Sequence, residues 1–426
     1  MKKFFLILIT IIISQNVLAQ WVQLNIPAID YIALAVAPNG AGGENIFAAT
    51  AGNGIRLSTN LGETWTTVNG SNGVLDYGII NTIGVSPNGT GGATIFAGLG
   101  GLGVFRSTNN GTDWAFSGIG NREVISFAKS PIGGDLFAGT RSDGIHHSTN
   151  DGLSWVKIGI SGLNINAVYS ITVTSSTGGL NVYAGTWLEG LFLLTNNFGF
   201  WTETNLGFMN DCVQMLTKIP NGTGGTNLYA GTNTGLYVST NGGSNWSPSL
   251  VDINSGVSSL VFSGTNYFAS TSEGVYVSTN SGQSWNAAND GLTNLNVSSL
   301  AIAGSYLFAS TVGEVGPVSI WRRPLSELTS IDLISDIQPS EFRLEQNYPN
   351  PFNPSTTISW QSPVGSWQSL KVYDILGREV ATLVDDYREA GYHTIEFDAS
   401  YLSSGVYYYQ LKINEYVSVK KMMLMK

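Results

Sequence analysis

The chain has 426 residues, of which 52 are Gly, and only 11% carry a charge, against about 25% in a typical soluble domain. The hydrophobic content of 42% excludes a disordered chain, and Gly without a G-X-Y period excludes collagen. A net charge of −10 with no basic stripe argues against a nucleic-acid partner. This composition predicts a folded, turn-rich, all-β protein of two or three domains.

Residues 1–19 have the pattern of a secretory signal peptide. Two Lys residues precede a mostly apolar run from Phe4 to Ile13, which is too short for a membrane span of about 20 apolar residues. Small side chains precede the predicted cleavage site between Ala19 and Gln20. The sequence therefore predicts export through the inner membrane and a mature chain without a transmembrane span.

The next part of the chain, residues 20–327, is a repeat. Trp residues recur about every 44 residues, which is the length of one four-stranded propeller blade, at Trp21, Trp65, Trp114, Trp155, Trp201, Trp246 and Trp285. An aromatic-Ala pair in a short predicted strand recurs with the same period, from Phe47-Ala48 to Phe308-Ala309. Seven such pairs predict a seven-bladed β-propeller.

Most of these Trp residues close an eight-residue box of the form Ser-Thr-Asn-x-Gly-x-x-Trp. The Asn can bind turn amides, the Gly supplies a positive φ, and the Trp is expected to cover the hairpin. Structural roles are therefore predicted for Asn60, Gly62, Trp65, Asn109, Gly111, Trp114, Asn150, Gly152, Trp155, Asn241, Gly243, Trp246, Asn280, Gly282 and Trp285. The fourth copy, which begins at Leu194 and has Phe198 where Gly belongs, predicts a distorted turn between strands that keep their register.

The boxes resemble the Asp-box (BNR) repeat, S-x-D-x-G-x-x-W, with Asn in place of Asp. That resemblance implies that the boxes are structural hairpins on the face away from any active site. The strand after Trp21 has no box before it, and the seventh unit has no fourth strand. We therefore expect the N-terminal strand to complete the last blade.

After the repeat, residues 328–340 are predicted to form a linker, and the remaining residues, 341–426, a small β-sandwich. Alternating apolar residues predict strands at 356–360, 369–373, 380–384, 392–397, 405–412 and 417–424. The predicted fold class is thus all-β, a seven-bladed β-propeller followed by a small Ig-like β-sandwich.

The C-terminal segment closely resembles the type A C-terminal sorting domain of the type IX secretion system. The matching motifs are YPNPFNPSTTI from Tyr348, VYDILGREV from Val372, GVYYYQLK from Gly405, and a basic tail with Lys420 and Lys421. The resemblance implies recognition by the type IX secretion machinery, passage through the outer membrane, and then surface attachment or release.

Charged and aromatic residues gather on the loops predicted to lie opposite the boxes. These loops hold the candidate binding residues Arg141, Asp143, Trp187, Glu189, Glu273 and Glu314. A Trp face can stack on a sugar ring, and carboxylates can bind its hydroxyl groups. The leading hypothesis is therefore a non-catalytic binding protein whose ligand is a polysaccharide, a protein or a surface component.

No motif assigns catalytic residues, a metal site or a cofactor. The single Cys, Cys212, has no partner for an intramolecular disulfide, and the three His residues lack a zinc pattern. The alternative hypothesis is a secreted glycoside hydrolase that uses carboxylates such as Asp143 and Glu189. Two such carboxyls about 5 to 9.5 Å apart in a central pocket would favour that enzyme.

Overall fold

The computed structural model describes residues 20–71, 73–158, 167–176, 178–195, 200–204, 212–221, 225–250, 255–313, 317–329 and 341–426. The predicted signal peptide, including Ala19, lies outside these residues, as do the centre of the fourth box and Glu314. The chain divides into two compact units, one ending at Ser326 and the other starting at Glu327. Each is described by itself.

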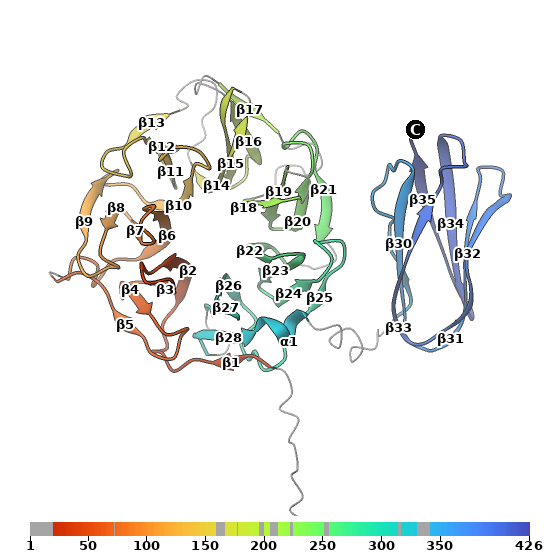
Figure 1. Ribbon diagram of the computed structural model, residues 1–426, viewed down its shortest axis with the longest axis horizontal. Helices are drawn as coiled ribbons and strands as arrows, with labels where there is room; N and C mark the ends of the chain where they lie inside the picture. Colours follow the sequence, from red (N-terminus) through yellow and green to blue (C-terminus); the bar gives the residue numbers. More distant parts are fainter. Residues whose placement is uncertain are drawn as a thin grey trace, which may run out of the picture. The chain divides into compact units, whose positions relative to one another are not determined.

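The first unit is a seven-bladed β-propeller (Figure 1). Its described residues form seven four-stranded antiparallel sheets. The innermost strands, which neighbour one another around the axis, are β2 (Tyr31–Pro38), β6 (Ile80–Pro87), β10 (Val124–Lys129), β14 (Val168–Ser176), β18 (Val213–Pro220), β22 (Val257–Ser263) and β26 (Val297–Ala303).

Three further strands complete each blade. The second strands are β3 (Glu44–Thr50), β7 (Ala93–Leu99), β11 (Leu136–Thr140), β15 (Gly179–Thr186), β19 (Thr226–Thr232), β23 (Asn266–Thr271) and β27 (Tyr306–Thr311). The third strands are β4 (Ile55–Ser58), β8 (Gly103–Ser107), β12 (Ile145–Ser148), β16 (Leu191–Thr195), β20 (Gly235–Ser239), β24 (Gly274–Ser278) and β28 (Ile320–Pro324). The outer strands are β5 (Thr66–Thr67), β9 (Ala115–Gly118), β13 (Val156–Ile158), β17 (Trp201–Glu203), β21 (Ser247–Leu250), β25 (Asn286–Ala287) and β1 (Val22–Gln23).

The second strands form the core because their aromatic-Ala pairs are buried in every blade. A Gly follows the pair in four blades, and there the next blade approaches closely. A Cβ at Gly139 would lie 2.7 Å from the carbonyl oxygen of Val168, and one at Gly231 would lie 2.3 Å from that of Val257. Part of the high Gly content therefore allows the backbones of neighbouring blades to approach closely.

The ring is closed by side chains as well as by strands. The Oγ of Ser126 donates to the carbonyl of Val168 (3.2 Å), and that of Ser170 donates to the carbonyl of Val213 (3.0 Å). A similar hydrogen bond joins the last blade to the first, from the Oγ of Ser298 to the carbonyl of Tyr31 (2.8 Å).

Strand β1 completes the last blade, as predicted. It pairs with β28 through Val22 and Arg322 and through Gln23 and Trp321. The chain end therefore occupies the outer position that the seventh unit leaves open, and the last blade has four strands like the others. The strands on either side of the fourth box also keep their register, with Leu194 opposite Trp201.

Each regular box forms the same turn between the third and outer strands. In the second box, the amide of Gly111 donates to the Oγ of Ser107 (2.9 Å), and the amide of Asp113 donates to the Oδ1 of Asn109 (2.9 Å). The Gly adopts a positive φ of 75° to 84° in all five regular copies. These contacts fix the turn by local side-chain hydrogen bonds.

The box Trp side chains contact the preceding blade, which differs from the expectation that each covers its own hairpin. The indole of Trp114 donates to the carbonyl of Val68 (2.7 Å), and that of Trp246 donates to the carbonyl of Thr204 (3.0 Å). Trp65 is different, since it donates to Gly62 within its own turn (3.1 Å). The Trp residues therefore join blades, and only the three-dimensional ring shows which blade each one reaches.

The propeller ends in a short helix, α1 (Leu325–Thr329), which the sequence analysis does not predict and which spans the expected boundary between propeller and linker. Among the described residues, no helix is long and apolar enough to cross a membrane.

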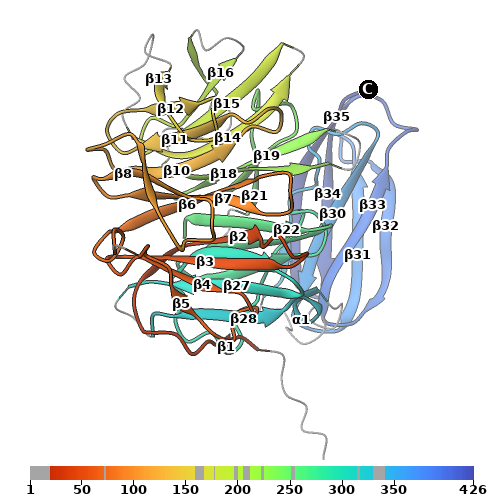
Figure 2. The same cartoon turned by 60° about the vertical axis from the view of Figure 1, so that its left-hand side comes forward.

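The second unit is a two-sheet β-sandwich (Figure 2). One sheet has the order β29 (Arg343–Leu344), β30 (Ser355–Ser362), β33 (Gly391–Asp398). The other has the order β32 (Glu379–Arg388), β31 (Ser366–Tyr373), β34 (Gly405–Ile413), β35 (Tyr416–Leu424). The six predicted strands lie within β30 to β35, and β29 is additional.

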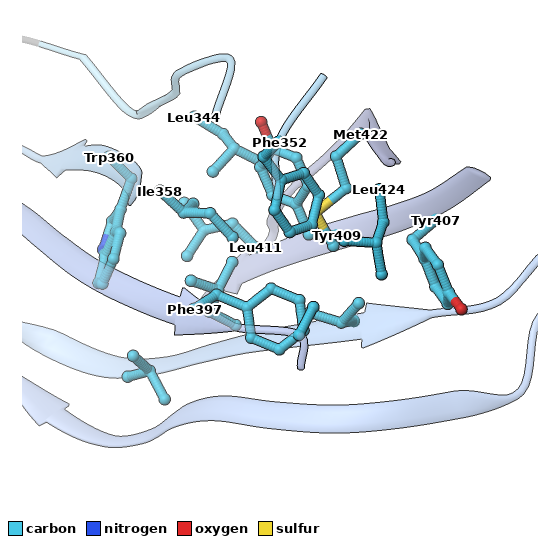
Figure 3. Close-up of a cluster of buried hydrophobic side chains, with 14 of the residues drawn as sticks. Leu344, Phe352, Ile358, Trp360, Phe397, Tyr407, Tyr409, Leu411, Met422 and Leu424 are labelled. Atoms are coloured by element: carbon cyan, nitrogen blue, oxygen red, sulfur yellow. The ribbon is translucent and has the colours of Figure 1, made fainter. Parts of the chain in front are cut away.

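Side chains from both sheets fill the core of this unit. Figure 3 shows Trp360 and Phe397 with Tyr409, Leu411 and Met422, and all five are buried. The predicted tail residues Lys420 and Lys421 lie on β35, whose apolar neighbours enter this core.

Candidate functional site

The two faces of the propeller carry different connections. Because the strands of a blade are antiparallel, the loops between second and third strands lie on the same face as the connections between blades. We call this the loop face. The boxes and the turns between first and second strands lie on the opposite face, which we call the box face. The candidate binding residues belong to the loop face.

An aromatic pair of blade 4 lies on the loop face and is contacted by an Arg of blade 3. Trp187, on the loop between β15 and β16, is 49% exposed, and its ring lies 5.0 Å from that of Tyr169 on β14. The guanidinium of Arg141, from the loop between β11 and β12, lies 5.3 Å from the Tyr169 ring centroid and donates to its hydroxyl. Arg141 also forms an ion pair with Glu123 (2.8 Å). The result is a row of packed and ion-paired side chains across blades 3 and 4.

A second carboxylate lies beside this row and contacts three nitrogen groups. Asp143 lies 2.8 Å from the Nζ of Lys157, 3.2 Å from the Nε of Arg122 and 3.1 Å from the Nε2 of His146. We refer to the side chains that form this row and the adjoining ion pairs as the loop-face cluster, namely Arg122, Glu123, Arg141, Asp143, Lys157, Tyr169 and Trp187.

The electrostatics of the cluster fix the charge of Asp143. Partial burial alone would raise the pKa of Asp143, but hydrogen bonds from Lys157, Arg122 and His146 outweigh this effect and lower the pKa to about 2. Burial lowers the pKa of His146 despite its contact with Asp143. At neutral pH Asp143 is therefore an anion that accepts hydrogen bonds, and His146 is mainly neutral.

Further apolar side chains are exposed on the loop face. Tyr77, on the connection from blade 1 to blade 2, is 94% exposed, and Leu102, on the loop between β7 and β8, is about half exposed. Leu188 follows Trp187 and is also exposed. The loop face over blades 2 to 4 thus offers aromatic and aliphatic surface next to charged groups.

The structure brings some of the predicted residues together. Arg141, Asp143 and Trp187 belong to the cluster, and Glu189 lies on the same loop as Trp187. Glu273 lies on the loop between β23 and β24 of blade 6, and no contact among the described residues joins it to the cluster. Glu314 lies outside the described residues.

Sequence reasoning missed Tyr169, the side chain at the centre of the row. It occupies a β-bulge between Val168 and Ser170, at the loop-face end of an innermost strand. Every blade has a register shift at the equivalent position, which holds Asn81 in blade 2 and Gln214 in blade 5. Tyr169 is the second residue of its innermost strand. Considering that position in every blade could have identified Tyr169, because a bulge redirects the side chain there.

The C-terminal unit matches a known family. Residues 346–425 match the model of the secretion system C-terminal sorting domain. This confirms the predicted type IX sorting domain and indicates that the protein is exported by the type IX secretion system, to be secreted or attached to the cell surface. No curated protein matches the chain.

Several solved structures resemble the chain at low sequence identity. The extracellular domain of a hybrid two component system of B. thetaiotaomicron has a TM-score of 0.57 and 14% identity, over 81% of this chain and 45% of that one. YCF48 bound to D1 peptide has a TM-score of 0.50 and 15% identity, over 74% and 97% of the two chains. PorZ of Porphyromonas gingivalis, a surface component of the type IX secretion system, has a TM-score of 0.47 and 16% identity, over 90% and 58%.

This chain therefore spans less than half the length of the first of these structures. At such identities, the likeness to the first two shows the β-propeller fold alone.

Proposed function

We propose that this protein is an exported, non-catalytic binding protein whose loop face binds a saccharide. One observation carries the proposal, namely the half-exposed Trp187 that packs against Tyr169 beside the guanidinium of Arg141. A large aromatic face next to fixed polar groups can cover the apolar face of a sugar ring while the polar groups bind its hydroxyls. The rigid second strands and innermost strands hold these loops in place.

The state of Asp143 argues against its use as the general acid of a glycoside hydrolase. A general acid in such an enzyme needs a carboxyl whose pKa is raised toward neutrality. The pKa of Asp143 is lowered to about 2, and its oxygens contact Lys157, Arg122 and His146. Asp143 is therefore suited to positioning cations rather than to donating a proton.

The proposal also includes the signal peptide, the type of propeller blade and the fold of the sorting domain. We infer a signal peptide in residues 1–19 with cleavage between Ala19 and Gln20, blades of the Asp-box type with Asn in the boxes, and an Ig-like sorting domain. The repeated hydrogen bonds of Ser107, Asn109 and their equivalents support a structural role for the boxes.

Export is tested by deleting residues 346–426 in a bacterium that has a type IX system. We expect the propeller to lose its 19 N-terminal residues and to stay between the two membranes, whereas the full chain reaches the outside. A truncated propeller that still reaches the medium would contradict the sorting role, and an uncleaved N-terminus would contradict the signal peptide.

Saccharide binding is tested with the purified full chain on a glycan array. The proposal predicts binding to at least one class of glycan, and loss of that binding when Trp187 is changed to Ala. An array without any signal, obtained with folded protein, would overturn the proposed function.

A further inference from the structure

The ion pairs of the loop-face cluster are arranged with the cations outward. Arg122 is 43% exposed while its partner Asp143 is 22% exposed, and Arg141 is 47% exposed while its partner Glu123 is 31% exposed. Lys157 is 42% exposed against the same Asp143. Within these pairs the guanidinium and ammonium side chains are therefore more accessible to an approaching molecule than their carboxylate partners.

The box face has the opposite arrangement. There the ion pair of Arg106 and Asp151 has the cation 22% exposed and the carboxylate 41% exposed. Outward cations are therefore not a general property of ion pairs in this propeller. The cluster holds three cations and two carboxylates, so it carries a small net positive charge in a chain whose total net charge is −10.

The guanidinium groups keep free donors. Within the described part of the chain, Arg141 uses its Nε for Glu123 and its Nη1 for Tyr169. A guanidinium has five N–H donors, so three remain, and a planar fork of this kind suits a carboxylate. Glu123 and Tyr169 hold the fork in position, which reduces the side-chain entropy lost when it binds a ligand.

We propose that the loop-face cluster binds an acidic polysaccharide, with Arg141 and Arg122 paired to a sugar carboxylate and Trp187 stacked on a pyranose ring. This inference rests on the proposed saccharide binding and names the class of sugar. The aromatic face distinguishes a uronate ring from a simple anion, since phosphate or a carboxylate side chain has no ring to stack. The outward cations distinguish a uronate from a neutral sugar.

The experiment titrates the full chain with uronate oligosaccharides and their methyl esters, using galacturonate, mannuronate and glucuronate oligomers. Each ester keeps the sugar ring and removes the charge. We expect one uronate to bind about tenfold or more tightly than its ester, and to bind more weakly as salt is added. Arg141→Gln and Trp187→Ala are each expected to weaken binding about tenfold.

A matched control removes a cation elsewhere. Arg378→Gln makes the same change of charge in the C-terminal unit, where Arg378 is paired with Asp374, and is expected to leave binding unchanged. Thermal unfolding of each variant shows whether it is folded, and Arg122→Gln replaces Arg141→Gln if the latter does not fold.

Three other results would each contradict the inference, and the measurements distinguish them. Equal affinity for a uronate and its ester, unaffected by Arg141→Gln, would leave saccharide binding intact but contradict the acidic class. Binding of poly-glutamate as tightly as any uronate, unaffected by Trp187→Ala, would indicate an acidic protein ligand. No binding to any of the uronates would contradict the inference, and only the wider array decides whether the proposed function fails with it.

Discussion

The box face and the loop face of the propeller are built on the same strands, yet they use their side chains in opposite ways. On the box face, one turn with the same hydrogen bonds recurs in five blades, and Trp side chains such as Trp114 and Trp246 join each turn to the blade before it. On the loop face, the ion pairs and the packed rings of Tyr169 and Trp187 gather over blades 3 and 4. A contact repeated around the ring can hold blades together, whereas a ligand site needs a group that occurs once.

The largest expected effect comes from a Trp of the box face. Trp246→Ala removes a buried indole and its hydrogen bond to Thr204, and should lower the free energy of unfolding of the propeller by about 4 kcal/mol. Trp187→Ala, on the loop face, should change it by less than about 0.5 kcal/mol because that indole is half exposed. Urea unfolding followed by far-UV circular dichroism measures both. Equal losses would remove the contrast between the faces.

The second largest loss of stability is expected when a Gly of a box is replaced. Gly152 has a φ of +75°, and a Cβ there would lie 2.3 Å from the ring of Phe96, so Gly152→Ala should cost about 3 kcal/mol. Gly133 has a similar φ of +70° but no atom within 4 Å of the added Cβ, so Gly133→Ala should cost about 1 kcal/mol. If the same unfolding measurement gives the two variants the same stability, the box does not pack tightly against the neighbouring blade.

A stability effect of about 1 kcal/mol is expected from the ion pairs of the loop-face cluster. The pKa of Asp143 is about 2 in the folded protein, below the value of about 3.9 for an unfolded chain, so its ion pairs stabilise the fold above about pH 4 and lose this effect as the pH falls toward 2. Asp143→Asn should therefore cost about 1 kcal/mol at pH 7 and almost nothing near pH 2. A difference between variant and wild type that does not shrink on acidification would contradict the ion-pair account.

Much of the fold follows from the sequence because each blade is a local unit. The period of the Trp residues and aromatic-Ala pairs predicts seven blades, and the unpaired strand after Trp21 predicts that it completes the last one, as its pairing with β28 confirms. Contacts between blades do not follow, since local patterns cannot show that the indole of Trp246 reaches Thr204 or that the fork of Arg141 reaches Tyr169. Short elements such as β29 and α1 carry too little pattern to be recognised.

The candidate site is less predictable than the fold for the same reason. The sequence selects Arg141, Asp143 and Trp187 as loop residues with suitable chemistry, but Tyr169 lies in a strand and is turned toward them by a bulge. The ion pairs join loops that are separate in the sequence, as Arg122 and Asp143 show. Separate loops such as that of Glu273 carry the same residue types without joining the cluster.

The central claim, that the loop face binds and the box face stabilises, is tested most directly by one comparison on a glycan that the full chain binds. Trp187→Ala and Leu153→Ala each remove an exposed apolar side chain, the first from the loop face and the second from the box turn of blade 3. The account predicts that Trp187→Ala weakens binding about tenfold while Leu153→Ala leaves it unchanged. Undiminished binding by Trp187→Ala, or an equal loss in both variants, would contradict it.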